Sequence, residues 1–384
     1  MKIGIAGCGI TGTAVAAMLA EFGHEITIFE QAPECHPIGA GILLQPSGQQ
    51  ILKRLGLFEE IEAHSARLDG LDARLKSGRQ LVRLQYARLD PEYYGLGVHR
   101  GLLFDRLLTL CKNRNVTIRT NSPVTGLEQI AEGAQFQIRE SELSEPFDFV
   151  IAADGSRSRL RDASGIRCLG YEYDYAALWL TGPLESIQDR LYQIVDGTQR
   201  LVGLLPIGEG QASFFWGLPA KEYQNLIAGS FNQWKDEVIS LCPEAEEILQ
   251  NIESFESLIF TTYRHVRMDR WHTNRCIFLG DAAHPSSPHL GQGVNLALED
   301  AACFTDALEQ STDFEAACQL YTSQRKAKLR YYQKVTGFLA PFFQSGYSSL
   351  AFGRNCVLPM LPSVPIVSRM MLQTLCGIKR SWLR

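Results

Sequence analysis

The sequence lacks several features that would assign it to a well-defined protein class. Its ten cysteines include no CxxC pair, and no histidine pair stands beside them at metal-ligand spacing, which argues against a zinc site. Lys and Arg occur in ones and twos rather than in a basic tract, so nothing indicates a nucleic-acid partner. No run reaches the roughly 20 apolar residues that a membrane-spanning helix needs. We therefore expect no metal, no nucleic acid and no transmembrane span.

The composition is that of an ordinary globular protein. The 384 residues are 45% hydrophobic and 21% charged, with a net charge of −5. This length predicts two domains or one large divided domain. Residues 1–6 resemble a strand rather than a secretory signal, so we expect reduced thiols in the cytoplasm.

The first stretch, "MKIGIAGCGITGTAVAAMLAEFGHEITIFE", predicts a strand, a glycine turn, a helix and, over residues 25–29, a second strand. In a dinucleotide fold Gly7 allows the tight turn, Gly9 lets a pyrophosphate approach the backbone, and Gly12 lets the helix lie close to the strand. The carboxylate of Glu30 can accept hydrogen bonds from ribose hydroxyls, and its negative charge disfavours a 2′-phosphate. The tight ligand is therefore of the FAD or NAD type, and the motif alone does not choose between them or exclude a structural βαβ unit.

Further elements follow along the chain. A glycine turn at 39–41 precedes a short apolar segment, and residues 71–84 alternate around a Ser-Gly pair, which predicts a hairpin. Short apolar runs over 171–219 predict an antiparallel sheet. The remaining expected elements are helices over 49–55, 100–111 and 221–250, strands over 116–120, 147–152, 257–263 and 276–279, and helices after residue 281. Gly56 is expected to end the helix over 49–55.

Two more motifs are candidates for ligand binding. In "VIAADGSRSRLRD", residues 150–162, a strand ends at Ala153, Asp154 and Gly155 make a turn, and Ser156 to Ser158 can cap the helix that begins near Arg159; a plain strand–turn–helix with an acid cap is the alternative. In "RCIFLGDAAHPSSPHLGQGVNLALEDA", residues 275–301, Asp281 can hold a sugar or ribityl hydroxyl. The Gly-rich segment at 291–295 then opens a long helix whose N–H groups face an anion.

These three motifs, in this order, resemble the group A flavoprotein monooxygenases, the aromatic-hydroxylase family that includes para-hydroxybenzoate and salicylate hydroxylases. The resemblance extends to "GAGILLQPSGQQILKRLGL", "HRGLLFDRLL" and "FFWGLP". It implies an α/β protein whose Rossmann-like FAD-binding domain is interrupted by an antiparallel β-sheet substrate domain, with a C-terminal helical segment. The expected boundaries are 1–70, 97–170 and 262–335 for the FAD-binding domain, 71–96 and 171–261 for the substrate domain, and 336–384 for the helical segment.

The resemblance also implies roles for individual residues. FAD contacts are expected at Gly7, Gly9, Gly12, Glu30, Gly41, Arg100, Val124, Asp154, Asp281, Gly291, Gly293, Val294 and Asn295. Pro288 matches a loop proline between flavin and substrate. His284 matches a recurrent position that we interpret as structural, and His265 has no assigned role.

The chemistry implied is that of an NAD(P)H-dependent FAD monooxygenase. NADH or NADPH binds transiently, because no second GxGxxG accompanies the first, and reduces the FAD. The flavin then reacts with O₂ to form a C4a-hydroperoxide, which transfers one oxygen atom to an aromatic or other electron-rich hydrophobic substrate. His289 is the candidate base, although a loop histidine bonded to backbone or water is the alternative. Tyr192, Leu205, Phe214 and Trp216 are expected to cover the flavin, unless they are ordinary sheet core.

Other interpretations stay open at this point. The same fold carries halogenases and prenyl-lipid reductases, but "FFWGLP" lacks the first Trp and the Ile of the halogenase motif WxWxIP. A flavin-binding protein without turnover is a third possibility. The apolar stretch from Thr336 either packs on the FAD-binding unit or lies on a membrane surface. The absence of an obvious Arg for a substrate carboxylate favours a neutral, hydrophobic substrate, and nothing in the sequence predicts the oligomeric state.

Overall fold

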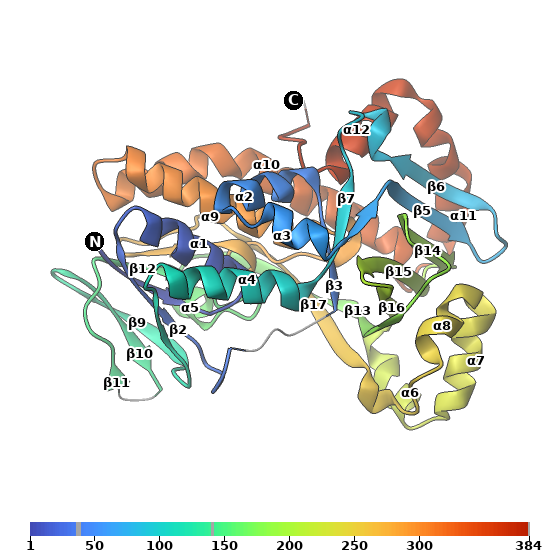
Figure 1. Ribbon diagram of the computed structural model, residues 1–384, viewed down its shortest axis with the longest axis horizontal. Helices are drawn as coiled ribbons and strands as arrows, with labels where there is room; N and C mark the ends of the chain where they lie inside the picture. The colour runs from blue at the N-terminus through green and yellow to red at the C-terminus, as the bar shows by residue number, and fades with distance from the viewer. Residues whose placement is uncertain (36–39, 140–141, 383–384) are drawn as a thin grey trace.

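A computed structural model describes residues 1–35, 40–139 and 142–382 of the protein (Figure 1). Its framework is a five-stranded parallel sheet and a seven-stranded sheet, joined and flanked by two smaller three-stranded sheets. Residue Gly39, which belongs to the glycine turn predicted at 39–41, lies outside the described residues. The predicted α/β fold class is confirmed.

The parallel sheet forms the nucleotide-binding type of core. Its strand order is β18–β12–β1–β2–β8, and every neighbouring pair is parallel. The strands are β1 (Lys2–Ala6), β2 (Glu25–Phe29), β8 (Thr117–Arg119), β12 (Phe149–Ala152) and β18 (Cys276–Phe278). Ligands of such sheets bind beyond the carboxyl ends of the strands, so this edge is where the site is expected.

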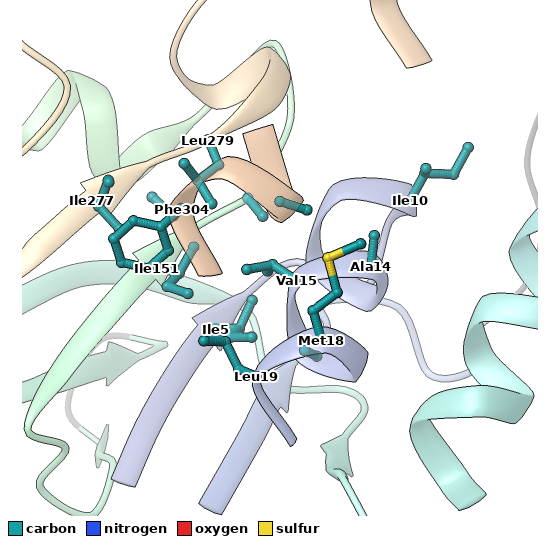
Figure 2. Close-up of a cluster of buried hydrophobic side chains, with 14 of the residues drawn as sticks. Ile5, Ile10, Ala14, Val15, Met18, Leu19, Ile151, Ile277, Leu279 and Phe304 are labelled. Carbon is teal, nitrogen blue, oxygen red and sulfur yellow. The ribbon is translucent and has the colours of Figure 1, made fainter. Parts of the chain in front are cut away.

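Helices α1 (Ile10–Glu21) and α9 (Gly293–Gln310) pack against this sheet and against each other. Figure 2 shows Val15 of α1 and Phe304 of α9 meeting Ile5, Ile151 and Ile277 of the strands, all of them fully buried. Almost every side of α1 is apolar, as expected of a helix that is covered all round. Each such side chain stabilises the fold by about 1.5–3 kcal/mol relative to its exposed state.

The seven-stranded sheet has the order β17–β13–β16–β15–β14–β5–β6. Its strands are β5 (Gly70–Leu75), β6 (Gln80–Gln85), β13 (Cys168–Pro183), β14 (Arg190–Asp196), β15 (Arg200–Gly208), β16 (Gln211–Pro219) and β17 (Ile259–Met268). The predicted antiparallel arrangement needs one correction, because β14 pairs with β5 in parallel. The hairpin β5–β6 comes from a distant part of the chain, and a long connection allows either strand direction. Strands β13 and β17 run through the boundaries predicted at 170–171 and 261–262.

The two faces of this sheet have different neighbours. One face packs against helices that include α7 (Phe231–Leu241) and α8 (Glu246–Leu249), with Trp234 at the centre of that cluster. The other face meets α10 (Phe314–Phe343), where Tyr173 and Tyr175 pack on Ala340. Figure 1 shows α7 and α8 outermost at lower right.

Two small sheets complete the framework. One joins β3 (Gly41–Leu44), β7 (Gly95–His99) and β4 (Ala66–Leu68). It lies so close to β15 that a Cβ at Gly41 would stand 2.5 Å from the Ile207 side chain. The other comprises β9 (Val124–Ile130), β10 (Gly133–Ile138) and β11 (Glu142–Leu143), and no element had been predicted there.

The C-terminal helices cover the hairpin β5–β6. After α10 come α11 (Ser349–Val357), the 3-10 helix η7 (Leu358–Ser363) and α12 (Pro365–Leu375). Leu372 and Leu375 of α12 share a cluster with Ala73, Val82 and Tyr86. The remaining helices are α2 (Pro46–Leu55), α3 (Phe58–Ala63), α4 (Arg100–Asn113), α5 (Arg159–Ala163) and α6 (Tyr223–Ile227).

Candidate active site

The three glycine- and aspartate-containing motifs meet at the carboxyl edge of the parallel sheet. Strands β1, β12 and β18 end immediately before them, and parallel strands end at the same edge. A Cβ added at Gly7 would clash with the carbonyl oxygen of Ala153, and one added at Gly280 would stand 2.5 Å from Thr11 Oγ1. The first motif therefore touches both the second and the third.

The first motif has the geometry of a phosphate cradle. Gly7 has a φ of +102°, and a Cβ at Gly12 would clash with the Gly7 carbonyl oxygen, so both positions require glycine. Among the residues that the structure describes, none but its chain neighbours comes within 4 Å of the Cβ position of Gly9, which leaves open space over the backbone. Glu30 accepts hydrogen bonds from Cys8 N at 2.8 Å and Ala32 N at 2.9 Å. Each carboxylate oxygen keeps acceptor capacity for a ribose hydroxyl.

Asp281 and Arg100 lie close enough for their charges to interact. Both side chains are accessible to solvent, yet protein surrounds them on most sides. Burial raises the pKa of Asp281, and the charges of His284 and Arg100 oppose that shift. Burial likewise lowers the pKa of Arg100, opposed by Asp281. An accessible carboxylate at this depth fits a ligand hydroxyl, which restores the hydrogen bonds lost to water.

Asp154 has one carboxylate oxygen ready for a ligand. Its Oδ2 accepts a hydrogen bond from Leu160 N at 3.3 Å, whereas Oδ1 is buried and has no partner among the residues described. Burial raises the pKa of this carboxyl group, opposed by its hydrogen bonds. The predicted capping by Ser158 is confirmed, since Ser158 Oγ accepts from Arg161 N at 3.0 Å.

Arg161 is a linking residue that the sequence analysis missed. It is almost fully buried and donates hydrogen bonds to the carbonyl oxygens of Ser156 at 3.1 Å and Ala282 at 3.2 Å. It therefore ties the second motif to the third. The only signal in the sequence was its place near the end of the second motif.

The N-terminus of α9 is open to an anion. Gly291 has a φ of +60°. Within the described part of the chain, nothing else lies within 4 Å of the Cβ position of Gly293, and the residue before the helix makes no side-chain cap. The first N–H groups of the helix are thus available to a ligand. Asn295 is fully buried and bonds to backbone, with Nδ2 donating to Leu43 O at 3.0 Å and to Gly291 O at 3.1 Å. Its side chain orders this segment.

The remaining predicted FAD contacts are Val124, Val294 and Gly41, and each of them packs against other residues of the protein. Val124 and Val294 are half-buried and pack on the main core. Gly41 makes the close approach to β15 described above, which explains the need for glycine there without a ligand.

The end of α12 supports the α9 segment. Gln292 Nε2 donates to the carbonyl oxygens of Leu375 at 2.8 Å and Thr374 at 3.3 Å. Ser47 N, at the start of α2, donates to Cys376 O at 3.2 Å. Residues 374–376 thereby hold both the start of α9 and the start of α2.

A buried network of ion pairs and hydrogen bonds stabilises the turn that carries Asp281. Asp300 Oδ2 lies 2.5 Å from His284 Nε2 and accepts from Gly280 N at 3.1 Å, while Arg325 Nε donates to Asp300 Oδ1 at 2.7 Å. Arg325 also pairs with Glu299. Burial alone would raise the pKa of Asp300, but the charges of Arg325 and His284 outweigh it and hold the pKa at about 2. The structural interpretation of His284 agrees with this placement.

Three of the four residues predicted to cover the flavin need correction. Tyr192, Phe214 and Trp216 point to the face of the large sheet that packs on α7 and α8, where Phe214 and Trp216 contact Trp234. Leu205 packs with Leu43 on the other face. Successive side chains of a strand alternate between faces, so a shift of one residue reverses the assignment.

The face toward α10 carries a different set of rings, which we call the aromatic wall: Tyr175, Trp179, Phe215 and Tyr263. Trp179 Nε1 donates to Tyr263 OH at 3.0 Å, and its ring lies 5.3 Å from that of Phe215. Tyr175 OH donates to Ser287 Oγ at 2.8 Å, which joins the wall to the loop before α9. The signal for Tyr175 was the tyrosine at every second position over 171–175.

His289 lies between this wall and the end of α10. It belongs to the 3-10 helix η6 (Pro288–Leu290), which also carries the predicted Pro288. His289 Nδ1 contacts Ser287 Oγ and lies 3.3 Å from Tyr175 OH, and the ring centre stands 6.1 Å from that of Phe343. Nε2 is buried without a partner among the described residues, and burial lowers the pKa of this histidine to about 4. His265, which has no assigned role, stacks on Tyr171 at 5.2 Å.

Together these features define a dinucleotide-binding α/β protein. The cradle residues fit FAD, because they combine an open glycine turn, an acid at the end of β2, an unpartnered Asp154 oxygen and an uncapped helix start. The sequence model of the FAD binding domain family matches residues 1–336. The chain belongs to this family.

Relatives and solved structures agree with this assignment. The chain is 27% identical over 352 residues to 6-hydroxynicotinate 3-monooxygenase of Bordetella bronchiseptica, covering 87% of this chain and 90% of the relative. It is 28% identical over 353 residues to an FAD-dependent urate hydroxylase of Klebsiella oxytoca, covering 86% and 87%. A structure of Klebsiella pneumoniae HpxO with FAD and uric acid has a TM-score of 0.82 at 22% identity, covering 98% and 97%, which shows a shared fold. The prediction of an FAD-dependent monooxygenase is confirmed.

Proposed function

We propose that the protein inserts one oxygen atom from O₂ into an electron-rich aromatic substrate held between the FAD and the aromatic wall. The observation that carries this proposal is the contact between Tyr175 on the wall and Ser287 in the loop that leads into α9. This contact joins a surface of rings to the segment that we assign to the flavin. Relatives named for nicotinate and urate oxidation, both ring substrates, support an aromatic substrate class.

The chemistry divides between cofactor and protein. Bound FAD, reduced by NADH or NADPH, supplies the activated oxygen. Gly9, Glu30, Asp154 and Asp281 would hold the cofactor, and the N–H groups at the start of α9 would stabilise negative charge on the reduced ring. The aromatic wall excludes water, which protects an oxygen-activating site from unproductive decay. The same assignment keeps residues 71–96 and 171–261 as the proposed substrate domain.

His289 is the proposed base. If Nδ1–H donates to Ser287 Oγ, Nε2 carries the lone pair, and Nε2 is the atom without a protein partner. Because its pKa is lowered to about 4, the imidazole stays neutral near pH 7 and can accept a proton from a ring hydroxyl. Ser287 and Tyr175 position the ring. The residues of the wall offer hydroxyls and ring faces rather than a cation, which favours a neutral substrate.

We expect His289→Ala to slow substrate oxygenation by roughly 10²–10⁴-fold, the usual contribution of a general base. Flavin reduction by the nicotinamide should be unchanged, because that step needs no proton from the substrate. In the unmodified enzyme the rate should persist as the pH falls and decline only near pH 4, where His289 becomes protonated. Stopped-flow absorbance of the flavin, together with product analysis, separates the two steps.

His265→Ala is the matched control, because burial lowers the pKa of this histidine too and it has no assigned role. If product formation survives in His289→Ala, or if both variants lose it equally, His289 is not the base.

The reaction itself is tested with a substrate screen. The purified protein should be yellow and release FAD on denaturation. Aromatic, quinone-like and polyene compounds are tested for acceleration of NADH and NADPH oxidation, with O₂ uptake and product mass as readouts. A compound that gains one oxygen atom supports the proposal, whereas return of all consumed O₂ as hydrogen peroxide with every compound contradicts it.

A further inference from the structure

The charge of the chain is segregated along its length. All 42 Asp and Glu residues lie at or before Glu315, whereas ten of the 37 Lys and Arg residues follow it. Residues 316–384 are therefore a positive segment on a chain whose net charge is −5. Of these ten, Arg325 and Lys328 are neutralised by Glu299 and Asp300 and Arg354 is buried, whereas Arg330, Lys334, Arg369 and Arg380 are exposed. This segment is electrostatically suited to a negatively charged partner.

The same segment also exposes large apolar side chains. Of the 15 exposed large hydrophobic residues in the described part of the chain, eight lie between residues 338 and 382. Five of them lie one after another along the segment that forms α11, η7 and α12. We call these five the C-terminal apolar edge: Phe352, Val357, Met360, Val364 and Ile366. Phe352 is 78% exposed and Ile366 83%. Figure 1 shows α11 and α12 at the upper right margin of the molecule. Such a concentration of apolar side chains marks an interaction surface.

The geometry of this region suits the surface of a membrane rather than its interior. Nowhere in residues 1–35, 40–139 and 142–382 is a single helix long and apolar enough to cross a bilayer, although residues 349–363 and 365–375 pass together as a pair bent by 98°. With nine and eleven residues, α11 and α12 are about 14 and 17 Å long, against a hydrocarbon core of about 30 Å. Short apolar helices beside basic residues lie in the headgroup region.

We propose that the C-terminal apolar edge docks on the surface of a bilayer that contains anionic phospholipids. The apolar side chains would enter the boundary between headgroups and acyl chains, and Arg369 and Arg380 would contact the headgroups. A symmetric contact between two copies through this edge would place like charges near each other. Charge complementarity therefore favours an anionic lipid surface over a second copy of the chain.

Docking at this edge would bring the proposed substrate site close to the lipid. Arg354 of α11 donates to the carbonyl oxygens of Phe342 at 2.7 Å and Gly197 at 2.9 Å. The next residue, Phe343, lies against His289. Helix α11, which carries part of the apolar edge, is thus connected to His289 through Arg354 and the half-buried residues 342–343.

The test uses the FAD-loaded protein and sedimentation with phosphatidylcholine vesicles, either pure or containing phosphatidylglycerol. We expect binding to the anionic vesicles that weakens as salt is added. The variant Phe352→Ser/Met360→Ser/Ile366→Ser should have an affinity for the anionic vesicles that is lower by a factor on the order of ten or more. The control Phe22→Ser/Leu143→Ser/Ile227→Ser removes three exposed apolar side chains elsewhere and should bind normally. Arg369→Glu/Arg380→Glu should abolish the preference for anionic lipid.

Flavin absorbance shows that each variant is folded, and the readout does not depend on turnover, so it stands apart from the test of the reaction. No binding to either vesicle overturns the proposal, as does an equal loss of binding in the control variant. A lipid-independent dimer in sedimentation equilibrium that dissociates in the apolar-edge variant would identify a second copy as the occupant instead.

Discussion

Replacement of Arg325 by methionine is expected to lower the free energy of unfolding by about 3–5 kcal/mol. Arg325 is buried and pairs with both Glu299 and Asp300, so its loss leaves the fully buried carboxylate of Asp300 without its main counter-charge, while Glu299 keeps its ion pair with Lys328. Asp300 also holds the turn at Gly280 and His284. The same variant should therefore bind FAD more weakly. Urea unfolding of the apoprotein, followed by circular dichroism, measures the stability change.

Arg330→Met is the control, because Arg330 lies on the same helix and is exposed. Its stability should change by no more than about 0.5 kcal/mol. The lowered pKa of Asp300 also determines how the free energy of unfolding depends on pH. The folded pKa of Asp300, about 2, lies below the ordinary value of about 3.9, so its contribution is present above pH 4 and is lost as the pH falls toward 2. Equal stability of the two methionine variants would show that the network contributes nothing.

Asp281→Ala is expected to weaken FAD binding by roughly ten- to hundredfold, because a hydrogen bond to a charged group contributes about 1.5–3 kcal/mol. The apoprotein should be no less stable than the unmodified one, since burial already disfavours the Asp281 carboxylate, as its raised pKa shows. Fluorescence titration of apoprotein with FAD measures the affinity. This separates loss of a ligand contact from loss of the fold.

Asp236→Ala, an exposed aspartate on α7, serves as the control and should leave the FAD affinity unchanged. Asp281→Asn keeps an acceptor without the charge and should fall between the two. Unchanged affinity in Asp281→Ala would remove this residue from the cofactor site.

Local features of the fold could be predicted because neighbouring residues determine them. Strand β2 has the predicted bounds, Gly56 ends α2 with a φ of +71°, and the glycines of the first motif meet the packing demands foreseen for them. Each depends on a short stretch of sequence. The sheet β9–β10–β11 was missed because its strands are mostly polar and their apolar alternation is weak.

The substrate face could not be predicted, for a physical reason. The seven-stranded sheet is buried on both faces, so β16 is apolar along nearly its whole length and shows no alternation that would tell one face from the other. Phe214, Phe215 and Trp216 differ only in register. The network of Asp300 and Arg325, and the support of Gln292 by Leu375, join residues far apart in sequence. Such pairings arise from the tertiary fold.

The support that residues 374–376 give to the start of α9 has a consequence for cofactor binding during synthesis of the protein. A ribosome-bound chain that has emerged only as far as α10 already contains every proposed cofactor ligand. It still lacks residues 374–376, whose carbonyl oxygens accept hydrogen bonds from Gln292 and Ser47. We therefore expect full affinity for the coenzyme only once α12 has docked against the start of α9.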